Sequence, residues 1–183
     1  MVAEEARRDV DEFDFSRLDA LPEPQSKPAP PPSASDLLAI FRTGLDRHRN
    51  GDLAGAQAIY TQVLKRDPKN YDALHLLGLA THQAGRSKEG IALISEGIAL
   101  NPRSEAMFSN RGAALLTLGR HAEALADFDQ AIALKPDLPQ AYQGRGAALQ
   151  ALHRPDEAKA SFDRALALKL FTPHGQGGGG DTL

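Results

Sequence analysis

The feature that most constrains the fold of this chain is a repeat of 34 residues. The stretch SNRGAALL, from Ser109 to Leu116, has a near copy in QGRGAALQ, from Gln143 to Gln150. Five series of positions share this spacing: Gly44, Gly78, Gly112 and Gly146; Pro68, Pro102 and Pro136; Gly51, Gly85 and Gly119; Tyr60, Ile94, Phe128 and Phe162; and Ala56, Gly90, Ala124 and Ala158. Self-similarity at a fixed period of about 20 to 50 residues indicates an array of stacked structural repeats.

Each repeat is expected to form two helices. In the third repeat, the segments EAMFSNRGAALLTL and HAEALADFDQAIAL flank the pair Gly119-Arg120, and the apolar residues of the second segment recur at helical spacing. Pro136 ends the second helix, because proline lacks an amide hydrogen and clashes with the preceding turn. Composition agrees with close-packed helices, since aromatic residues make up only 5% of the chain and Trp is absent.

The first glycine series lies in the middle of predicted helices, where each glycine costs about 1 kcal/mol relative to alanine. A cost repeated four times indicates a compensating role in packing. We predict that the missing side chain at Gly112 lets the partner helix bring Ala124 close. The residues predicted to pack the repeats together are Gly44, Gly78, Gly112, Gly146, Ala56, Ala124, Ala158, Phe128 and Phe162.

The second helix of repeat two, SKEGIALISEGIAL at residues 87–100, contains both Gly90 and Gly97. By intrinsic propensity it should be less stable than the other second helices by about 1 to 2 kcal/mol. We predict local fraying of this helix. The two glycines are interpreted either as sites of tighter packing or as a functional hinge.

The segments outside the repeats differ from them in composition. Residues 1–36 hold nine acidic and four basic side chains, a balance of −5, and the remainder of the chain carries +2. Six of the eleven residues in 22–32 are proline, which favours an extended linker, and residues 171–183 are rich in glycine. We therefore expect disordered tails at 1–36 and 171–183. Between them we place four repeats at 37–70, 71–104, 105–138 and 139–170.

Composition also excludes several classes of protein. The absence of cysteine excludes disulfides, thiol nucleophiles and cysteine metal sites. The N-terminal stretch MVAEEARRDV lacks the apolar region of a signal peptide, and no apolar run reaches the roughly 18 residues of a membrane span. A charge of +2 over the repeats is too weak for a nucleic-acid-binding surface. We expect a soluble cytoplasmic protein that binds neither nucleic acid nor membrane.

Catalytic motifs are missing from the sequence. The fragment GRGAAL has no preceding strand and is interpreted as packing, and no P-loop, HExxH or GxSxG motif occurs. His75 and His82 are two helical turns apart, about 10 Å, which is too far to share a metal ion. Asp127 and Asp129 are interpreted as a solvated face rather than an acid/base pair. We expect no enzymatic activity, no metal and no cofactor.

Together these positions resemble the tetratricopeptide repeat family. The match covers residues 37–170 and rests on Gly at the eighth place of the repeat, Ala at the twentieth, an aromatic residue at the twenty-fourth and Pro at the thirty-second. The resemblance implies an all-α fold, an α-solenoid of four helix-turn-helix repeats in a right-handed superhelix. The chain departs from the family pattern at Thr43, Arg111 and Arg145 in the seventh place, at His153 in place of the turn glycine, and at Leu170 in place of the last proline.

The family resemblance further implies that the first helix of each repeat lines a concave groove for an extended peptide or a partner's surface. The groove residues implied in this chain are Arg42, His48, Arg49, His75, His82, Gln83, Ser109, Asn110, Gln140, Gln143 and Gln150. The Arg- and His-rich half is expected to favour acidic partners, and the amides suit a peptide backbone of any sequence. The alternative is that all of them are ordinary exposed polar residues.

The groove residues bear differently on two branches of the family. The chaperone-binding branch requires Lys and Arg where this chain has Gln140 and Gly144, so this branch is not expected. The repeat arms of bacterial proteins similar to O-linked N-acetylglucosamine transferases are a closer resemblance, through DALHLLGLATHQAGR and Asn110. We expect a scaffold or adaptor that binds a protein partner. The alternative is an accessory or fragment of such a glycosyltransferase. Because no transferase domain follows Leu170, the chain would be at most a fragment or a stand-alone relative of such an enzyme.

Both ends of the chain raise further hypotheses. Residues 13–21, FDFSRLDAL, combine apolar and acidic side chains, and the linker is long enough for them to dock on the first two repeats. Simple disorder of this segment is the alternative. No polar capping helix follows Leu170, so Leu166 and Leu170 are expected on an uncovered face. We interpret that face either as a self-association surface or as a sign that the chain is truncated.

Overall fold

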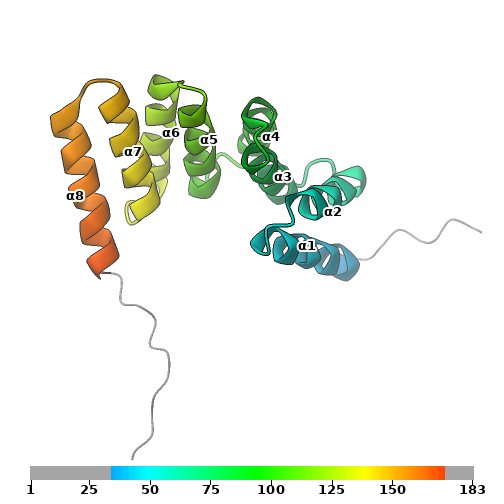
Figure 1. Ribbon diagram of the computed structural model, residues 1–183. Coiled ribbons are helices and arrows are strands. Elements are labelled where there is room, and N and C mark those ends of the chain that lie inside the picture. Colours follow the sequence, from blue (N-terminus) through cyan, green and yellow to red (C-terminus); the bar gives the residue numbers. More distant parts are fainter. Residues whose placement is uncertain (1–33, 172–183) are drawn as a thin grey trace, which may run out of the picture. The chain divides into compact units, whose positions relative to one another are not determined.

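A computed structural model of the chain describes residues 34–171. Within this range the protein consists of eight α-helices and has no strand (Figure 1). The helices are α1 (Ala34–Arg49), α2 (Leu53–Arg66), α3 (Tyr71–Gln83), α4 (Ser87–Leu100), α5 (Glu105–Thr117), α6 (His121–Leu134), α7 (Pro139–Ala151) and α8 (Pro155–Phe171). The acidic segment 13–21, the proline-rich linker at 22–32 and the tail residues 172–183 lie outside the described range. Residues 34–36 and 171, which were expected from the sequence to lie in disordered tails, belong to α1 and α8, so the tail boundaries are corrected at both ends.

The eight helices form four antiparallel hairpins that stack in chain order (Figure 1). The first helices of neighbouring hairpins also contact one another, α3 with α5 and α5 with α7. In residues 34–171 no two second helices have a comparable contact. Because the stack is tighter on the side of the first helices, it curves toward them, and they line its concave side. The predicted all-α solenoid of four helical hairpins is confirmed.

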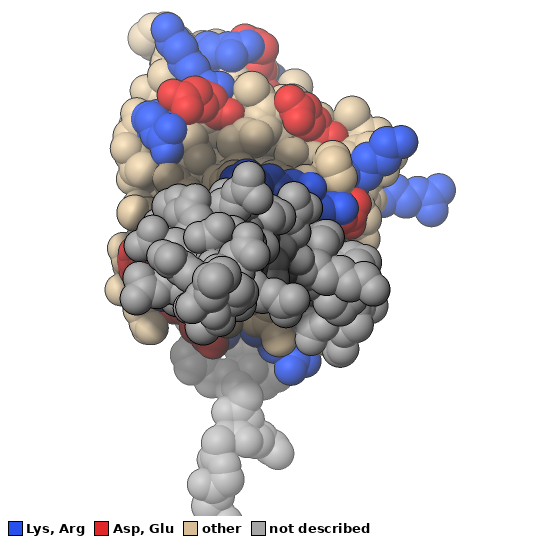
Figure 2. Space-filling view, turned by 90° about the vertical axis from the view of Figure 1, so that its right-hand side faces the viewer, with Lys and Arg blue, Asp and Glu red and all other residues tan. Residues whose placement is uncertain are grey.

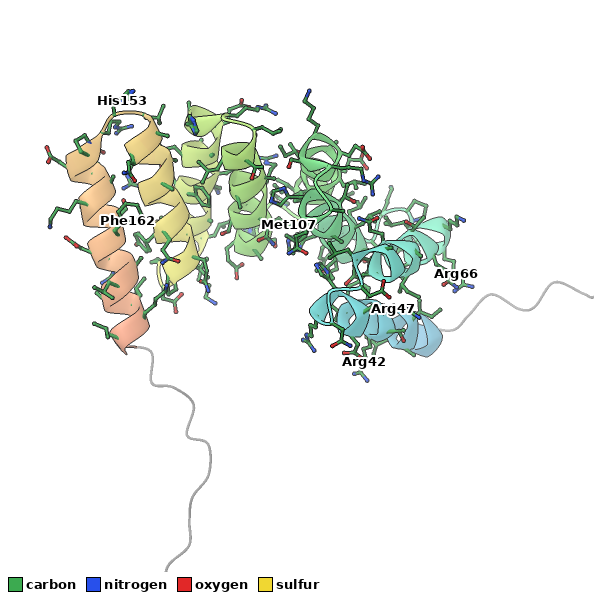
Figure 3. The ribbon with its side chains drawn as sticks, in the orientation of Figure 1. Arg42, Arg47, Arg66, Met107, His153 and Phe162 are labelled. Carbon is green, nitrogen blue, oxygen red and sulfur yellow. The ribbon has the colours of Figure 1, made fainter. Side chains whose placement is uncertain are left out.

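Glycine shapes the turn inside three of the hairpins. Gly51, Gly85 and Gly119 have φ angles of 79°, 85° and 71°, in the left-handed region where a side chain is unfavourable. In the fourth hairpin His153 occupies the same position with φ 58° (Figure 3). Histidine is one of the few other residues that enter this region with any frequency, so the turn is kept at a local cost.

We expect that replacing His153 with glycine raises the free energy of unfolding. A left-handed residue with a Cβ costs about 1 to 2 kcal/mol, and the greater freedom of glycine in the unfolded chain offsets part of the gain. The expected net stabilisation is about 0.5 kcal/mol in urea denaturation. Gly119→Ala, at the equivalent turn, is the matched control and should destabilise the protein by about 1 kcal/mol. Destabilisation by His153→Gly would contradict this account.

The residue at the twenty-fourth place forms the centre of each of the first three hairpins. Tyr60, Ile94 and Phe128 are almost completely buried, each at 2% exposure or less. A Cβ placed on Gly112 would lie 3.0 Å from the Phe128 ring, so the group nearest to this glycine is Phe128 rather than Ala124. The sequence prediction is corrected accordingly. The glycine makes room for the residue sixteen positions later, because the first helix crosses the second at that level.

The other glycines of the series pack in the same way. A Cβ on Gly44 would meet the Tyr60 ring at 2.7 Å, and a Cβ on Gly146 would meet the Phe162 ring at 2.6 Å. All of these distances are shorter than real Cβ contacts. The series therefore allows α1 and α7 to lie directly against the aromatic ring of their partner helix.

Repeat two replaces the aromatic ring with a closer approach of the two backbones. A Cβ on Gly78 would lie 2.8 Å from the carbonyl oxygen of Gly90 and 2.7 Å from Ile94. Gly97 is in looser contact, with the sulfur of Met107 at 3.2 Å from the position of its Cβ (Figure 3). These contacts support the packing interpretation of the two glycines in α4. The fraying of this helix stays a prediction.

The Phe128 ring also contacts the next repeat. It lies between Gly112 on α5 and Gly144 on α7, and a Cβ on Gly144 would lie far inside contact distance of the ring. In the sequence Gly144 stood out only because it occupies a position where the chaperone-binding branch requires a basic residue. The structure gives a physical reason for the glycine, since any side chain at this position would displace the ring that joins repeats three and four.

The last helix presents an uncovered apolar stripe. Phe162, Leu166 and Leu170 are 39%, 58% and 75% exposed, and they recur every four residues along α8 (Figure 3 labels Phe162). α8 has 17 residues, whereas α6 has 14 and ends one residue before Lys135-Pro136. Leucine in place of the last proline lets the helix continue. Self-association through this stripe stays a prediction.

Candidate functional site

The first helices supply all eleven residues that the sequence assigned to the groove, and the structure divides them by exposure. Arg42, Arg49, Gln83, Gln140, Gln143 and Gln150 are exposed, His48, His82, Ser109 and Asn110 are half-buried, and His75 is buried. A buried side chain cannot meet a ligand directly. His75 is therefore not a contact residue, contrary to the expectation from the sequence, and any role in binding is indirect.

His75 is joined to Asn110 across the boundary between repeats two and three. The Nε2 atom of His75 on α3 lies 2.7 Å from the Nδ2 atom of Asn110 on α5. Only a neutral imidazole with a free lone pair on Nε2 can accept this hydrogen bond. Burial lowers the pKa of His75 below its ordinary value of 6.5, which favours the neutral form.

A second pair joins repeats one and two. The Nε2 atom of His48 on α1 lies 2.7 Å from the Oε1 atom of Gln83 on α3, so here the imidazole donates. The hydroxyl of Tyr60 lies 3.4 Å from the Nδ1 atom of the same ring. In both pairs the amide is 35 residues after the histidine. Histidine and amide thus bridge successive first helices at one fixed spacing, one place longer than the repeat.

The remaining groove residues differ in how far they are already engaged. His82 Nδ1 lies 2.9 Å from the hydroxyl of Ser87, and burial lowers the pKa of His82. Arg49 is near Asp46 at 3.8 Å, a weak and solvent-exposed pair. Four exposed side chains have no polar partner within residues 34–171: Arg42, Gln140, Gln143 and Gln150. These four are free to contact a ligand (Figure 3 labels Arg42).

The two arginines at the seventh place of their repeats point between second helices rather than into the groove. Arg111 donates to both carboxylate oxygens of Asp127, at 2.8 and 2.7 Å, and to the hydroxyl of Ser95 at 3.0 Å. The carboxylate raises the pKa of Arg111. Because Ser95 belongs to α4 and Asp127 to α6, one guanidinium connects the second helices of repeats two and three.

Arg145 repeats this connection with the two partners exchanged. It donates to Asp129 on α6 at 2.6 Å and to the hydroxyl of Ser161 on α8 at 2.8 Å. Arg145 therefore binds an aspartate of the preceding repeat, whereas Arg111 binds an aspartate of its own repeat. Two of the three departures from leucine at the seventh place, Arg111 and Arg145, thus have a structural role in joining repeats.

The interpretation of Asp127 and Asp129 as one solvated face is wrong for the first of them. Asp127 is 5% exposed and bound to Arg111, whereas the side chain of Asp129 is 51% exposed. Residues 127 and 129 lie on different sides of α6, because two positions along a helix differ by about 200°. The sequence did contain a sign that Asp127 is buried, because no other repeat has a charged residue at the twenty-third place. The residues there are Ile59, Leu93 and Ser161.

A cavity of about 310 Å³ lies beside Arg111, between α4 and α6. Its lining residues are Ile91, Ser95, Arg111, Leu115, Arg120, Glu123, Ala126 and Asp127. The charged groups in it are already paired, Arg111 with Asp127 and Arg120 with Glu123 at 2.5 Å. Charged groups that are already paired within the protein leave few free donors or acceptors to bind a ligand. We therefore place the candidate site on the concave side and not in this cavity.

Two further properties of the described residues bear on the site. In residues 34–171 no three His, Asp or Glu side chains are close enough to hold a metal ion. No helix of this part of the chain combines the length and the hydropathy that crossing a membrane requires. On the face seen in Figure 2, Lys and Arg are interspersed with Asp and Glu, and neither sign forms a continuous patch over its visible part.

Comparison with known sequence families agrees with the repeat architecture. Three profiles described as tetratricopeptide repeat match residues 48–109, 106–138 and 139–170. Together they span most of the helical array. No curated protein matches the chain in sequence.

Solved structures share the fold. A crystal structure of MamA is 23% identical, with a TM-score of 0.67 over 73% of this chain and 78% of MamA. The second repeat domain of Spaghetti (RPAP3), bound to the HSP90 peptide SRMEEVD, is 28% identical with a TM-score of 0.54, over 56% of this chain and 95% of that one. A mutant O-GlcNAc transferase of Thermobaculum terrenum is 27% identical with a TM-score of 0.62, and the match covers 69% of this chain but 26% of the transferase.

Proposed function

We propose that this chain, which belongs to the tetratricopeptide repeat family, is a non-catalytic scaffold that binds an extended segment of a partner protein along its concave side. The observation that carries the proposal is the set of exposed side chains on the first helices without a polar partner among the described residues: Arg42, Gln140, Gln143 and Gln150. The peptide bound to the similar repeat domain of RPAP3 supports a peptide ligand.

The chemistry of the surface suggests what kind of segment it binds. Gln140, Gln143 and Gln150 on α7 can each donate and accept hydrogen bonds, as a peptide backbone requires. Arg42 and Arg49 on α1 place positive charge at the other end of the array. The preferred ligand is an extended peptide with acidic residues at one end and little side-chain selectivity at the other.

Selection from a library of displayed random peptides, followed by calorimetry with the full chain, tests this proposal. Arg42→Glu is expected to weaken binding of an acidic selected peptide by about three- to tenfold, with a smaller effect at high salt. Gln143→Ala should weaken it by a similar factor through a lost backbone hydrogen bond. Gln130→Ala, exposed on the second helix α6, is the matched control and should leave the affinity unchanged.

The selection can also contradict the proposal. A library that yields no binder would count against it, as would selected peptides whose affinity responds to Gln130→Ala and ignores both groove variants. Since all three positions are exposed, unfolding of the variants is not expected to confuse the result.

A second function, as accessory or fragment of an O-linked glycosyltransferase, is favoured by one observation, the 27% identity to the transferase of Thermobaculum terrenum. The match covers 26% of that chain, and the transferase's activity is not attributed to this protein. Calorimetric binding of a nucleotide sugar to the full chain would support this alternative. Absence of such binding, together with peptide binding, would support the scaffold.

A further inference from the structure

The two histidine–amide pairs leave opposite chemical groups unpaired on the first helices. Asn110 uses its amide nitrogen to bind His75, at 2.7 Å, and its Oδ1 atom has no partner in residues 34–171. This oxygen is not one of the buried unpaired atoms of the described range, so it is accessible to solvent. Gln83 uses its oxygen to bind His48, which leaves its Nε2 atom free. One amide thus offers an acceptor and the other a donor.

We propose that His75 is a positioning residue that holds Asn110 so that its Oδ1 atom accepts a hydrogen bond from a backbone N–H group of the bound peptide. The inference rests on the proposed function and adds to it the direction in which the peptide chain runs along the groove. At the boundary of repeats two and three, the peptide must donate a backbone N–H to Asn110. At the boundary of repeats one and two, His48 orients Gln83 so that its Nε2 atom donates to a backbone C=O of the peptide. This arrangement selects one direction of the peptide chain.

The tautomers of the two rings follow from the same geometry. Nε2 of His75 accepts, so its proton must be on Nδ1, whereas Nε2 of His48 donates and carries the proton itself. Protonation of His75 would place a hydrogen on Nε2 that faces the Asn110 amide nitrogen. The amide would then rotate by half a turn to offer its oxygen to the imidazolium, and its NH₂ group would face the ligand.

The electrostatic surroundings of His75 are simple. Burial is the sole cause of its lowered pKa, and no ionisable group on α2, α4 or α5, which pack against α3, contributes to the shift. Among these groups, Arg111 is engaged by Asp127, and Glu96 on α4 is exposed. On α3 itself Asp72, one turn before His75, is exposed as well. The hydrogen bond to Asn110 is therefore the specific interaction that a substitution can change.

Nuclear magnetic resonance of the ¹⁵N-labelled full chain tests the positioning without any ligand. We expect the Nδ1–H tautomer for His75, the Nε2–H tautomer for His48, and a scalar coupling across the hydrogen bond between Asn110 Nδ2 and His75 Nε2. The coupling should disappear as His75 is protonated. The Nε2–H tautomer at His75, or no coupling at neutral pH, would overturn the inference.

Substitution of the amides provides a matched pair of variants. Asn110→Asp introduces a carboxylate that accepts from the imidazolium, so the titration midpoint of His75 should rise by about one to two pH units. Gln83→Glu, the equivalent change at the other boundary, should leave the midpoint of His75 unchanged. A His75 midpoint that is unaffected by Asn110→Asp would contradict the contact.

The effect on recognition is measured with a peptide selected on the wild-type chain. Affinity should fall about five- to tenfold as the pH is lowered through the His75 midpoint, since the ligand N–H then loses its acceptor. His75→Gln keeps a neutral acceptor for Asn110 and should retain the affinity and remove this pH dependence. Retained pH dependence in His75→Gln would overturn the proposal.

The two failures are distinguishable. A chain that binds selected peptides but lacks the coupling refutes the role of His75 and leaves the proposed function intact. A chain that shows the coupling but binds no peptide refutes the proposed function, and with it the recognition step inferred here.

Discussion

Replacing Gly144 with alanine is expected to lower the free energy of unfolding by about 1 to 3 kcal/mol, the usual cost of overpacking a filled core. The new methyl group would overlap the Phe128 ring, which is 2% exposed and already packed against Gly112. Helix propensity predicts the opposite sign, because alanine is favoured over glycine by about 1 kcal/mol inside a helix. Urea denaturation therefore distinguishes overpacking from helix propensity, because the two predict changes of opposite sign in the free energy of unfolding.

Two variants control this experiment. Ala147→Gly, exposed on the same helix, should cost about 1 kcal/mol and so measures propensity alone. Phe128→Leu removes the outer ring atoms that the methyl group would meet, and the double variant with Gly144→Ala should be more stable than the sum of the single effects predicts. If Gly144→Ala stabilised the protein, the close contact between α7 and Phe128 would not exist.

Arg111→Leu is expected to lower the free energy of unfolding by about 3 to 5 kcal/mol. The substitution leaves the carboxylate of Asp127, 5% exposed, buried without the guanidinium that binds both of its oxygens. Size is not the obstacle, since the equivalent position of repeat two is naturally Leu77. Chemical denaturation of the full chain measures the effect.

Arg145→Leu is the matched control because the side chain of Asp129 is 51% exposed and can be hydrated when its partner is lost. This change should cost about 1 kcal/mol or less. Replacing Asp127 with alanine in the Arg111→Leu background should recover most of the lost stability, because no charge then remains buried. Equal losses for Arg111→Leu and Arg145→Leu would contradict the unequal burial of the two acids.

The repeat architecture could be predicted from the sequence because it depends on local chemistry. Proline after each of the first three second helices and glycine in the turns fix where helices end, and the recurring mid-helix glycine marks the close contact between them. The contact partner was not predictable from the period alone. Which residue faces Gly112 depends on the angle between the two helices, and it is Phe128.

The pairs between repeats were missed for a related physical reason. His75 meets Asn110, and Arg111 meets Ser95, because each repeat is offset from the last by a particular translation and twist. Polar residues predicted to be exposed carry no information about that translation and twist, so their partners in the next repeat could not be predicted. The spacing of 35 that both histidine–amide pairs share is a signal in the sequence, but it acquires meaning only when the stacking of the first helices is known.

The most direct test of the central claim, that the first helices form a docking surface, is mapping of a bound peptide by resonance shifts. A selected peptide is titrated into the ¹⁵N-labelled full chain, and the shifted amide signals are assigned to helices. The account predicts that the largest shifts lie on α1, α3, α5 and α7 and include the side-chain NH₂ groups of Asn110 and Gln143. Shifts confined to the second helices α2, α4 and α6, or to the apolar stripe of α8, would contradict it.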